Sequence, residues 1–235
     1  MHSHTALRDR LAAHPVTVLT GIIFTAAAAA CSSTPNQVPT SMAIVSGNGQ
    51  TATVASAVGA PMVVQIKDQN GNPLSGVHVS FNANGGATVS NVLTTTDASG
   101  NASTSMVLGT VSGLDTVTVV ADSVVNPLYF TVTANPGPAA ALVLVSGGNQ
   151  TASAGTALTN GLVVQVTDQY GNPVPGATID WTASAGTVTT TAQSTSAPNG
   201  TFGAVLQLPA NAGTVTVTAT IDGTSITAVF TETGD

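Results

Sequence analysis

The sequence VVQIKDQNGNP at residues 63–73 returns as VVQVTDQYGNP at residues 163–173, at an offset of 100 residues. Other landmarks keep this offset, namely Ser46-Gly47 with Ser146-Gly147, Gln50-Thr51-Ala52 with Gln150-Thr151-Ala152, Gly100 with Gly200, and Phe130-Thr131 with Phe230-Thr231. Long self-similarity at constant spacing indicates one structural unit present in two copies. The sequence therefore predicts two domains of one kind, at residues 42–135 and 141–235, joined by a short linker at residues 136–140.

Apolar and polar residues alternate within each copy. Val77, Val79 and Phe81, for example, are separated by His78 and Ser80. A period of two is typical of strands with one buried face, and no segment has the period of an amphipathic helix. In the first copy the pattern predicts strands at residues 42–46, 50–55, 61–68, 77–82, 92–96, 102–108, 115–122 and 128–134. Short strands separated by Gly, Asn and Pro favour an all-β fold of two antiparallel sandwiches.

The strongest turn signal lies at residues 68–76, and at residues 168–176 in the second copy. Asn70-Gly71 tolerates a positive φ, Asp68 can accept hydrogen bonds from its own turn backbone, and Pro73 fixes φ and removes a ladder donor. These features predict a chain reversal that passes from one sheet of the sandwich to the other.

The segments DQNGNPLSGVHVSF at residues 68–81 and DQYGNPVPGATIDW at residues 168–181 resemble the first group of bacterial Ig-like domains, the repeats of intimin and invasin adhesins. The segment TDASGNA at residues 96–102 is also similar to that family. The resemblance covers nearly all of the chain from Met42 to Thr233. It implies two tandem Ig-like antiparallel β-sandwich domains, used as rod segments in cell-surface adhesion.

The first 30 residues have the pattern of an export signal. Arg8 and Arg10 precede an uncharged stretch at residues 16–30, which is short compared with the roughly 20 apolar residues of a membrane span. The stretch ends in five alanines, of which Ala28, Ala29 and Ala30 directly precede Cys31, the only cysteine of the chain. We therefore expect residues 1–30 to be a signal peptide, followed by a flexible linker that extends to residue 41.

The junction at Cys31 resembles a bacterial lipoprotein lipobox. The resemblance implies cleavage before Cys31, lipidation of its thiol with acyl chains such as palmitate, and anchoring of the protein in the cell envelope, at the outer membrane or the cell surface. The same alanines also satisfy an ordinary signal-peptidase site, which would leave a secreted or periplasmic protein. Both interpretations stay open at this point.

The charge of the chain excludes some partners. Only 6% of the residues are charged, against roughly 25% in average soluble domains. Lys67 is the only Lys or Arg beyond Cys31, where nine Asp and Glu residues occur. Binding to phosphate backbones requires the opposite sign of charge, so nucleic acid is excluded as a partner. Electrostatic attachment to anionic lipid is excluded for the same reason, and a membrane is expected as a partner only through the lipid anchor.

Residues that could carry out chemistry are few. His78 is the only histidine beyond the leader, and alternation places it on the solvent face without a second group to orient it. Asp68 and Asp168 could ligate Ca²⁺, but turn capping is favoured because no dense acidic cluster surrounds either of them. We therefore expect no catalytic residue, no metal site and no cofactor, and the protein is predicted not to be an enzyme.

Two aromatic residues are candidates for contact with a partner. Trp181, like Phe81, lies on the inward phase of its strand and is interpreted as a core residue, with sugar stacking as the alternative. Tyr170 replaces Asn70 at the turn tip, where a ring has no core to fill, and it is the best single contact candidate. The sequence favours an adhesion or spacer module, with a carbohydrate-binding module as the alternative. The partner would be a surface polymer, a glycan, or a protein of a host or neighbouring cell.

Overall fold

The computed structural model describes residues 36–190 and 197–235, and these residues form β-strands and no helix. The predicted signal peptide and Cys31 lie outside the described residues. A search of the described part for helices of sufficient length and apolarity to cross a bilayer finds none.

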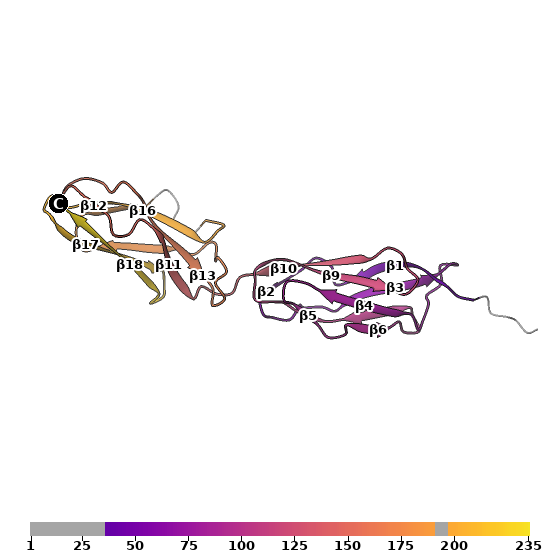
Figure 1. Ribbon diagram of the computed structural model, residues 1–235. Helices are drawn as coiled ribbons and strands as arrows, with labels where there is room; N and C mark the ends of the chain where they lie inside the picture. Colours follow the sequence, from indigo (N-terminus) through magenta and orange to yellow (C-terminus); the bar gives the residue numbers. More distant parts are fainter. Residues whose placement is uncertain (1–35, 191–196) are drawn as a thin grey trace, which may run out of the picture. The chain divides into compact units, whose positions relative to one another are not determined.

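The first sandwich contains ten strands (Figure 1). They are β1 (Pro39–Ser46), β2 (Gln50–Thr53), β3 (Met62–Asp68), β4 (His78–Ala83), β5 (Thr88–Val89), β6 (Leu93–Thr95), β7 (Asn101–Thr104), β8 (Met106–Val107), β9 (Gly113–Ala121) and β10 (Leu128–Asn135). One sheet has the order β1-β3-β7, the other has the order β2-β10-β9-β4-β6, and β5 pairs with β8 separately.

The second sandwich contains eight strands in its described residues. They are β11 (Ala141–Ser146), β12 (Thr151–Ala152), β13 (Leu162–Thr167), β14 (Ile179–Ala183), β15 (Thr187–Thr190), β16 (Thr201–Gln207), β17 (Gly213–Ile221) and β18 (Thr227–Gly234). Its sheets have the orders β11-β13-β16-β15 and β12-β18-β17-β14. The predicted all-β fold of two tandem Ig-like sandwiches is confirmed.

Each core is built from the inward residues of the alternating strands. In β3, for example, the burial of successive residues alternates between full and partial. The most deeply buried side chains of the first sandwich are Met62, Val64, Ile66, Val79, Phe81, Met106, Val117, Val119, Phe130 and Val132. Those of the second are Leu162, Val164, Val166, Leu206, Val215, Val217, Ala219 and Phe230. With no disulfide possible from a single cysteine, burial of these apolar side chains is the main stabilising term.

The landmark Ser46-Gly47 marks the point where the first strand changes sheet. β1 pairs antiparallel with β3, and after the bend at Gly47 the chain continues as β2, which pairs parallel with β10 in the other sheet. Gly47 has a φ of 88°, and a Cβ atom there would lie 2.4 Å from the carbonyl oxygen of Pro61. Gly147 repeats this arrangement between β11 and β12, which explains why the pair recurs in the sequence.

The predicted strands of the first copy all overlap observed strands, with three differences. β1 begins at Pro39 and pairs with β3 from there, so residues 39–41 belong to the sandwich and not to the predicted linker. The segment predicted at residues 102–108 is divided at Ser105, whose backbone nitrogen donates to the hydroxyl of Ser90 at 3.0 Å. This division lets the chain pair first with β3 and then with β5. The two-residue strand β5 was not predicted, because two residues are too few to establish a period.

Candidate functional site

The turn at residues 168–176 is organised around the buried carboxylate of Asp168. Its Oδ1 atom accepts from the backbone nitrogens of Tyr170 at 2.8 Å and Asn172 at 2.9 Å. Its Oδ2 atom accepts from the side chain of Asn172 and from the backbone nitrogen of Gly137 in the linker, both at 2.8 Å. The carboxylate therefore closes the turn and also attaches the preceding linker to it, as turn-forming Asp residues can do.

The first copy repeats most of this geometry. Oδ1 of Asp68 accepts from the backbone nitrogens of Asn70 and Asn72, both at 2.8 Å. Its Oδ2 atom lies 3.5 Å from the side-chain nitrogen of Gln37, the residue that corresponds to Gly137. The prediction that these aspartates hydrogen-bond their own turn backbone is confirmed. The predicted passage between sheets is also confirmed, because β3 and β4 belong to different sheets.

Hydrogen bonds stabilise the charged form of both turn carboxylates. Burial opposes ionisation, but the bonds from Asn72 and Asn70 outweigh it and hold the pKa of Asp68 below the ordinary value of 3.8. For Asp168, burial is likewise outweighed by bonds from Asn172, Gly137 and Tyr170, and its pKa also lies below 3.8. Both groups are therefore anionic hydrogen-bond acceptors over the physiological pH range.

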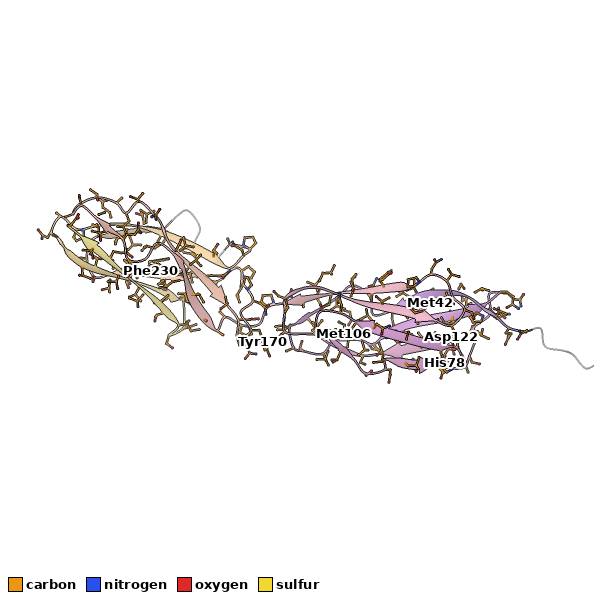
Figure 2. All side chains as sticks on the ribbon, viewed as in Figure 1. Met42, His78, Met106, Asp122, Tyr170 and Phe230 are labelled. Atoms are coloured by element: carbon orange, nitrogen blue, oxygen red, sulfur yellow. The ribbon has the colours of Figure 1, made fainter. Side chains whose placement is uncertain are left out.

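Tyr170 lies at the tip of this turn and is 44% exposed (Figure 2). Its backbone nitrogen is fixed by Asp168, so the position of the residue is set even though its ring is outside the core. Gly171 follows with a φ of 84° and completes the reversal. The structure thus places Tyr170 where an aromatic contact residue could reach a partner, and its role in contact stays a prediction.

Trp181 packs within the second sandwich. Its ring stacks on Phe230 at a centroid distance of 5.8 Å and on Phe202 at 6.3 Å. The indole nitrogen is buried and has no hydrogen-bond partner among the described residues. Because the ring stacks on two core aromatics and the residue is partly buried against the core, the interpretation of Trp181 as a core residue is supported over an exposed sugar-stacking platform.

The remaining candidates of the sequence are not brought together into a reactive group. His78 is exposed at the start of β4, and its carbonyl accepts from the backbone nitrogen of Asp122 at 3.1 Å (Figure 2). Within residues 36–190 and 197–235, no three His, Cys, Asp or Glu side chains lie close enough together to hold a metal ion. The turn aspartates are occupied with backbone donors instead.

Two buried acids were not recognised in the sequence as unusual. Asp115 on β9 and Glu232 on β18 are both buried in the sandwich cores. Alternation could have revealed them, because Asp115 has the same phase as Val117 and Glu232 has the same phase as Phe230. An acid on the inward phase of a strand requires a structural or functional reason.

Residues 140–233 match the family model of the bacterial Ig-like domain (group 1). The match confirms the resemblance that the turn motifs indicated, for the second copy. A search of curated proteins gives no match.

Several solved structures are similar to this chain. InvD of Yersinia pseudotuberculosis is 21% identical over 86% of this chain and 58% of that chain, with a TM-score of 0.55. The Escherichia coli adhesin FdeC is 23% identical over 83% of this chain and 64% of that chain, with a TM-score of 0.44. Invasin, a bacterial integrin-binding protein, is 25% identical over 83% of this chain and 39% of that chain, with a TM-score of 0.41. This chain thus spans less than two thirds of each of these structures, and the likeness to InvD shows the fold.

Proposed function

We propose that this protein is a non-enzymatic, lipid-anchored module of the bacterial cell envelope, whose Ig-like sandwiches act in adhesion or as a spacer. The observation that carries the proposal is the match of residues 140–233 to the bacterial Ig-like domain, a domain type that the sequence motifs connect with surface adhesins. The similar solved structures include proteins described as adhesins, which supports the same class of function for this chain.

The anchor is proposed to be an acylated Cys31, joined to β1 at Pro39 by a linker at residues 32–38 that reaches at most ~25 Å when extended. Several acyl chains, at about 0.8 kcal/mol per buried methylene, would hold the protein on a membrane almost irreversibly. The test compares the intact mass and detergent partitioning of the wild type and Cys31→Ala after expression in a bacterium. A wild-type mass without acyl chains, in a water-soluble product, would replace the anchored protein with a secreted or periplasmic one.

The contact residue is proposed to be Tyr170. An exposed tyrosine held by a rigid turn supplies apolar area and a hydroxyl at low entropic cost, which is why such residues are frequent at interfaces. The test measures binding of the purified chain to bacterial cells, host matrix and envelope polymers, with Tyr170→Asn as the variant because the first copy has Asn70 there. Loss of binding in Tyr170→Asn, with unchanged folding, supports adhesion through this turn.

Absence of binding to every one of these surfaces would reduce the function to that of a spacer. The carbohydrate-binding alternative is less favoured, since Trp181 is packed against Phe202 and Phe230 instead of lying on an exposed face. A glycan array separates the two, because a carbohydrate-binding module gives a defined glycan signal and a protein adhesin gives none.

A further inference from the structure

Each sandwich buries one carboxyl group at the same place in its core, and the two groups come from opposite strands. In the first sandwich, Asp115 of β9 lies opposite Val132 of β10. In the second, Val215 of β17 lies opposite Glu232 of β18. At the offset of the repeat, Val215 corresponds to Asp115 and Glu232 corresponds to Val132. Both copies therefore have one acid and one valine at this cross-strand pair, with the strands exchanged.

Both carboxyls have an oxygen atom without a hydrogen bond. Asp115 is 5% exposed and Glu232 is 0% exposed. Oδ2 of Asp115 and Oε1 of Glu232 have no partner among the described residues, although Oε2 of Glu232 accepts from the backbone nitrogen of Gln150 at 2.6 Å. A buried charge that is incompletely hydrogen-bonded is costly, and the group avoids most of this cost by binding a proton.

A glycine next to Asp115 in the first copy is replaced in the second copy, which has Val215 instead of the acid. A Cβ atom on Gly85 would lie 2.0 Å from Oδ1 of Asp115, so the first copy leaves space for the carboxyl at this glycine. At the offset of the repeat, the second copy has Ala185 in place of Gly85 and Val215 in place of Asp115. The two positions thus change together between the copies, which indicates that the core is built around the acid.

No positively charged group lies close to Asp115. Lys67 and His78 are the only residues of the first copy that can carry a positive charge, and they lie at opposite ends of the turn that joins β3 to β4. His78 bonds to Asp122, which follows the last residue of β9, whereas Asp115 is the third residue of β9. The end of the sandwich opposite to Asp115 therefore holds both of these residues, together with the acids Asp68, Asp97 and Asp122. The groups that face Asp115 from β10 and from the loop after β4 are Val132 and Gly85, both uncharged.

The surroundings of Glu232 are also uncharged. The second copy has no Lys, Arg or His at all beyond residue 140. Val215 of β17 and Gln150 before β12 face the carboxyl. The next acid along the chain is Asp235, which is exposed and follows the last residue of β18, and Asp168, Asp180 and Asp222 lie elsewhere in the second copy. No ion pair is therefore available to compensate ionisation of Glu232.

We propose that Asp115 and Glu232 form a pH-responsive device present in both repeats, in which uptake of a proton by the buried acid stabilises the sandwich around it. Burial raises the pKa of Asp115 above the ordinary 3.8. Burial also raises the pKa of Glu232 above 4.5, although the hydrogen bonds from Gln150 and Asn149 act in the opposite direction.

The direction of the pH effect follows from these raised values. The unfolded chain releases these protons at a lower pH than the folded chain does, so stability decreases as the pH rises from the ordinary values through the folded-state pKa of each acid. Below the ordinary values both states are protonated and the penalty is absent. Above the folded-state pKa both states are ionised and the penalty is complete. Acidification from neutral pH therefore stabilises both sandwiches.

The direct test is a carbon-13 NMR titration of the full chain that follows the side-chain carboxyl carbons of Asp115 and Glu232. The same two signals are titrated in the chain unfolded by urea, which supplies the reference midpoints. We expect both folded-state midpoints to lie above the unfolded ones, and the unfolding temperature to rise as the pH is lowered from neutral toward the unfolded-state midpoints. Folded-state midpoints at or below the unfolded ones would overturn the proposal.

A variant pair tests the same idea by thermal unfolding. Asp115→Val combined with Glu232→Val places at each position the residue of the other copy, and it should remove the rise in unfolding temperature. Asp122→Asn combined with Asp222→Asn removes two exposed carboxylates and should keep the rise. If the valine variant does not fold, Asp115→Asn with Glu232→Gln retains the shape of both side chains. A rise that persists without the two buried acids is the result that contradicts the proposal.

Discussion

The side chain of Asn172 donates from Nδ2 to the backbone carbonyl of Thr110 at 2.8 Å, joining the turn of the second repeat to a loop of the first. Oδ1 of the same side chain accepts from the backbone nitrogen of Ser112, also at 2.8 Å. Because both bonds use backbone atoms of the loop between β8 and β9, they do not depend on the side chains of that loop. Asn172 itself is 6% exposed.

Replacing Asn172 by alanine tests how much these hydrogen bonds stabilise the protein. Asn172→Ala removes both bonds to the loop and the bond to Asp168, and we expect a loss of about 1–3 kcal/mol in the free energy of unfolding. The amide proton of Ser112 should exchange faster with solvent. Asn72→Ala is the matched control, since Asn72 occupies the same turn position in the first repeat, and it should leave the exchange of Ser112 unchanged. Equal exchange rates in both variants would contradict the connection.

A pair of glycine variants tests the close packing beneath the turn. Gly200 and Gly171 both have positive φ, at 75° and 84°. A Cβ atom on Gly200 would lie 2.7 Å from the carbonyl oxygen of Val166, whereas a Cβ atom on Gly171 meets nothing within 4 Å. The left-handed conformation alone costs an alanine about 1–2 kcal/mol. Gly171→Ala should therefore lose about that amount and Gly200→Ala clearly more, as measured by urea unfolding. Similar losses would show that the approach to Val166 is not restrictive.

Trp181 provides a signal specific to the second repeat, because it is the only tryptophan of the chain. Its fluorescence emission should shift to longer wavelength when urea separates the ring from Phe202 and Phe230. Trp181→Ala should cost about 3–5 kcal/mol, the usual loss for deleting a large core aromatic. Trp181→Phe, which introduces the residue of position 81, should cost less. Urea unfolding followed by circular dichroism gives the free energy of unfolding of both variants. A negligible loss of this free energy in Trp181→Ala would place the ring outside the core.

The turn aspartates should make the folded protein less stable at low pH. The pKa values of Asp68 and Asp168 are lowered by folding, so their contribution is complete above the ordinary value of 3.8 and is lost as the pH falls through the folded-state values. Thermal unfolding between about pH 6 and about pH 2 should show this loss. Asp68→Asn combined with Asp168→Asn should be less stable at neutral pH, and its unfolding temperature should depend less on pH in the acid range. The same loss of stability in acid in the variant and the wild type would exclude the turn aspartates as its cause.

The sequence allowed prediction of those features that depend on local pattern. Alternation correctly placed Phe81 in the core and His78 in solvent, and turn chemistry correctly gave Asp68 its role as a backbone acceptor. The contact between Asn172 and Ser112 joins residues 60 positions apart, and no local pattern specifies such a pair. Alternation gives the inward phase of Asp115, but the space that Gly85 leaves for its carboxyl depends on how two segments 30 residues apart are packed together.

The parallel pairing of β2 with β10 has a consequence for tension along the chain. β2 continues the direction of β1 and runs beside the last strand of the sandwich, so the chain enters and leaves the first domain at opposite ends. A pulling force between these ends acts along the strands and shears their hydrogen bonds together, so that no single bond is loaded first. The second repeat has the same edge between β12 and β18, where the backbone bonds from Asn149 to Thr231 and from Ala154 to Asp235 repeat those from Gly49 to Thr131 and from Val54 to Asn135. We therefore expect single-molecule stretching to unfold the two repeats at similar forces.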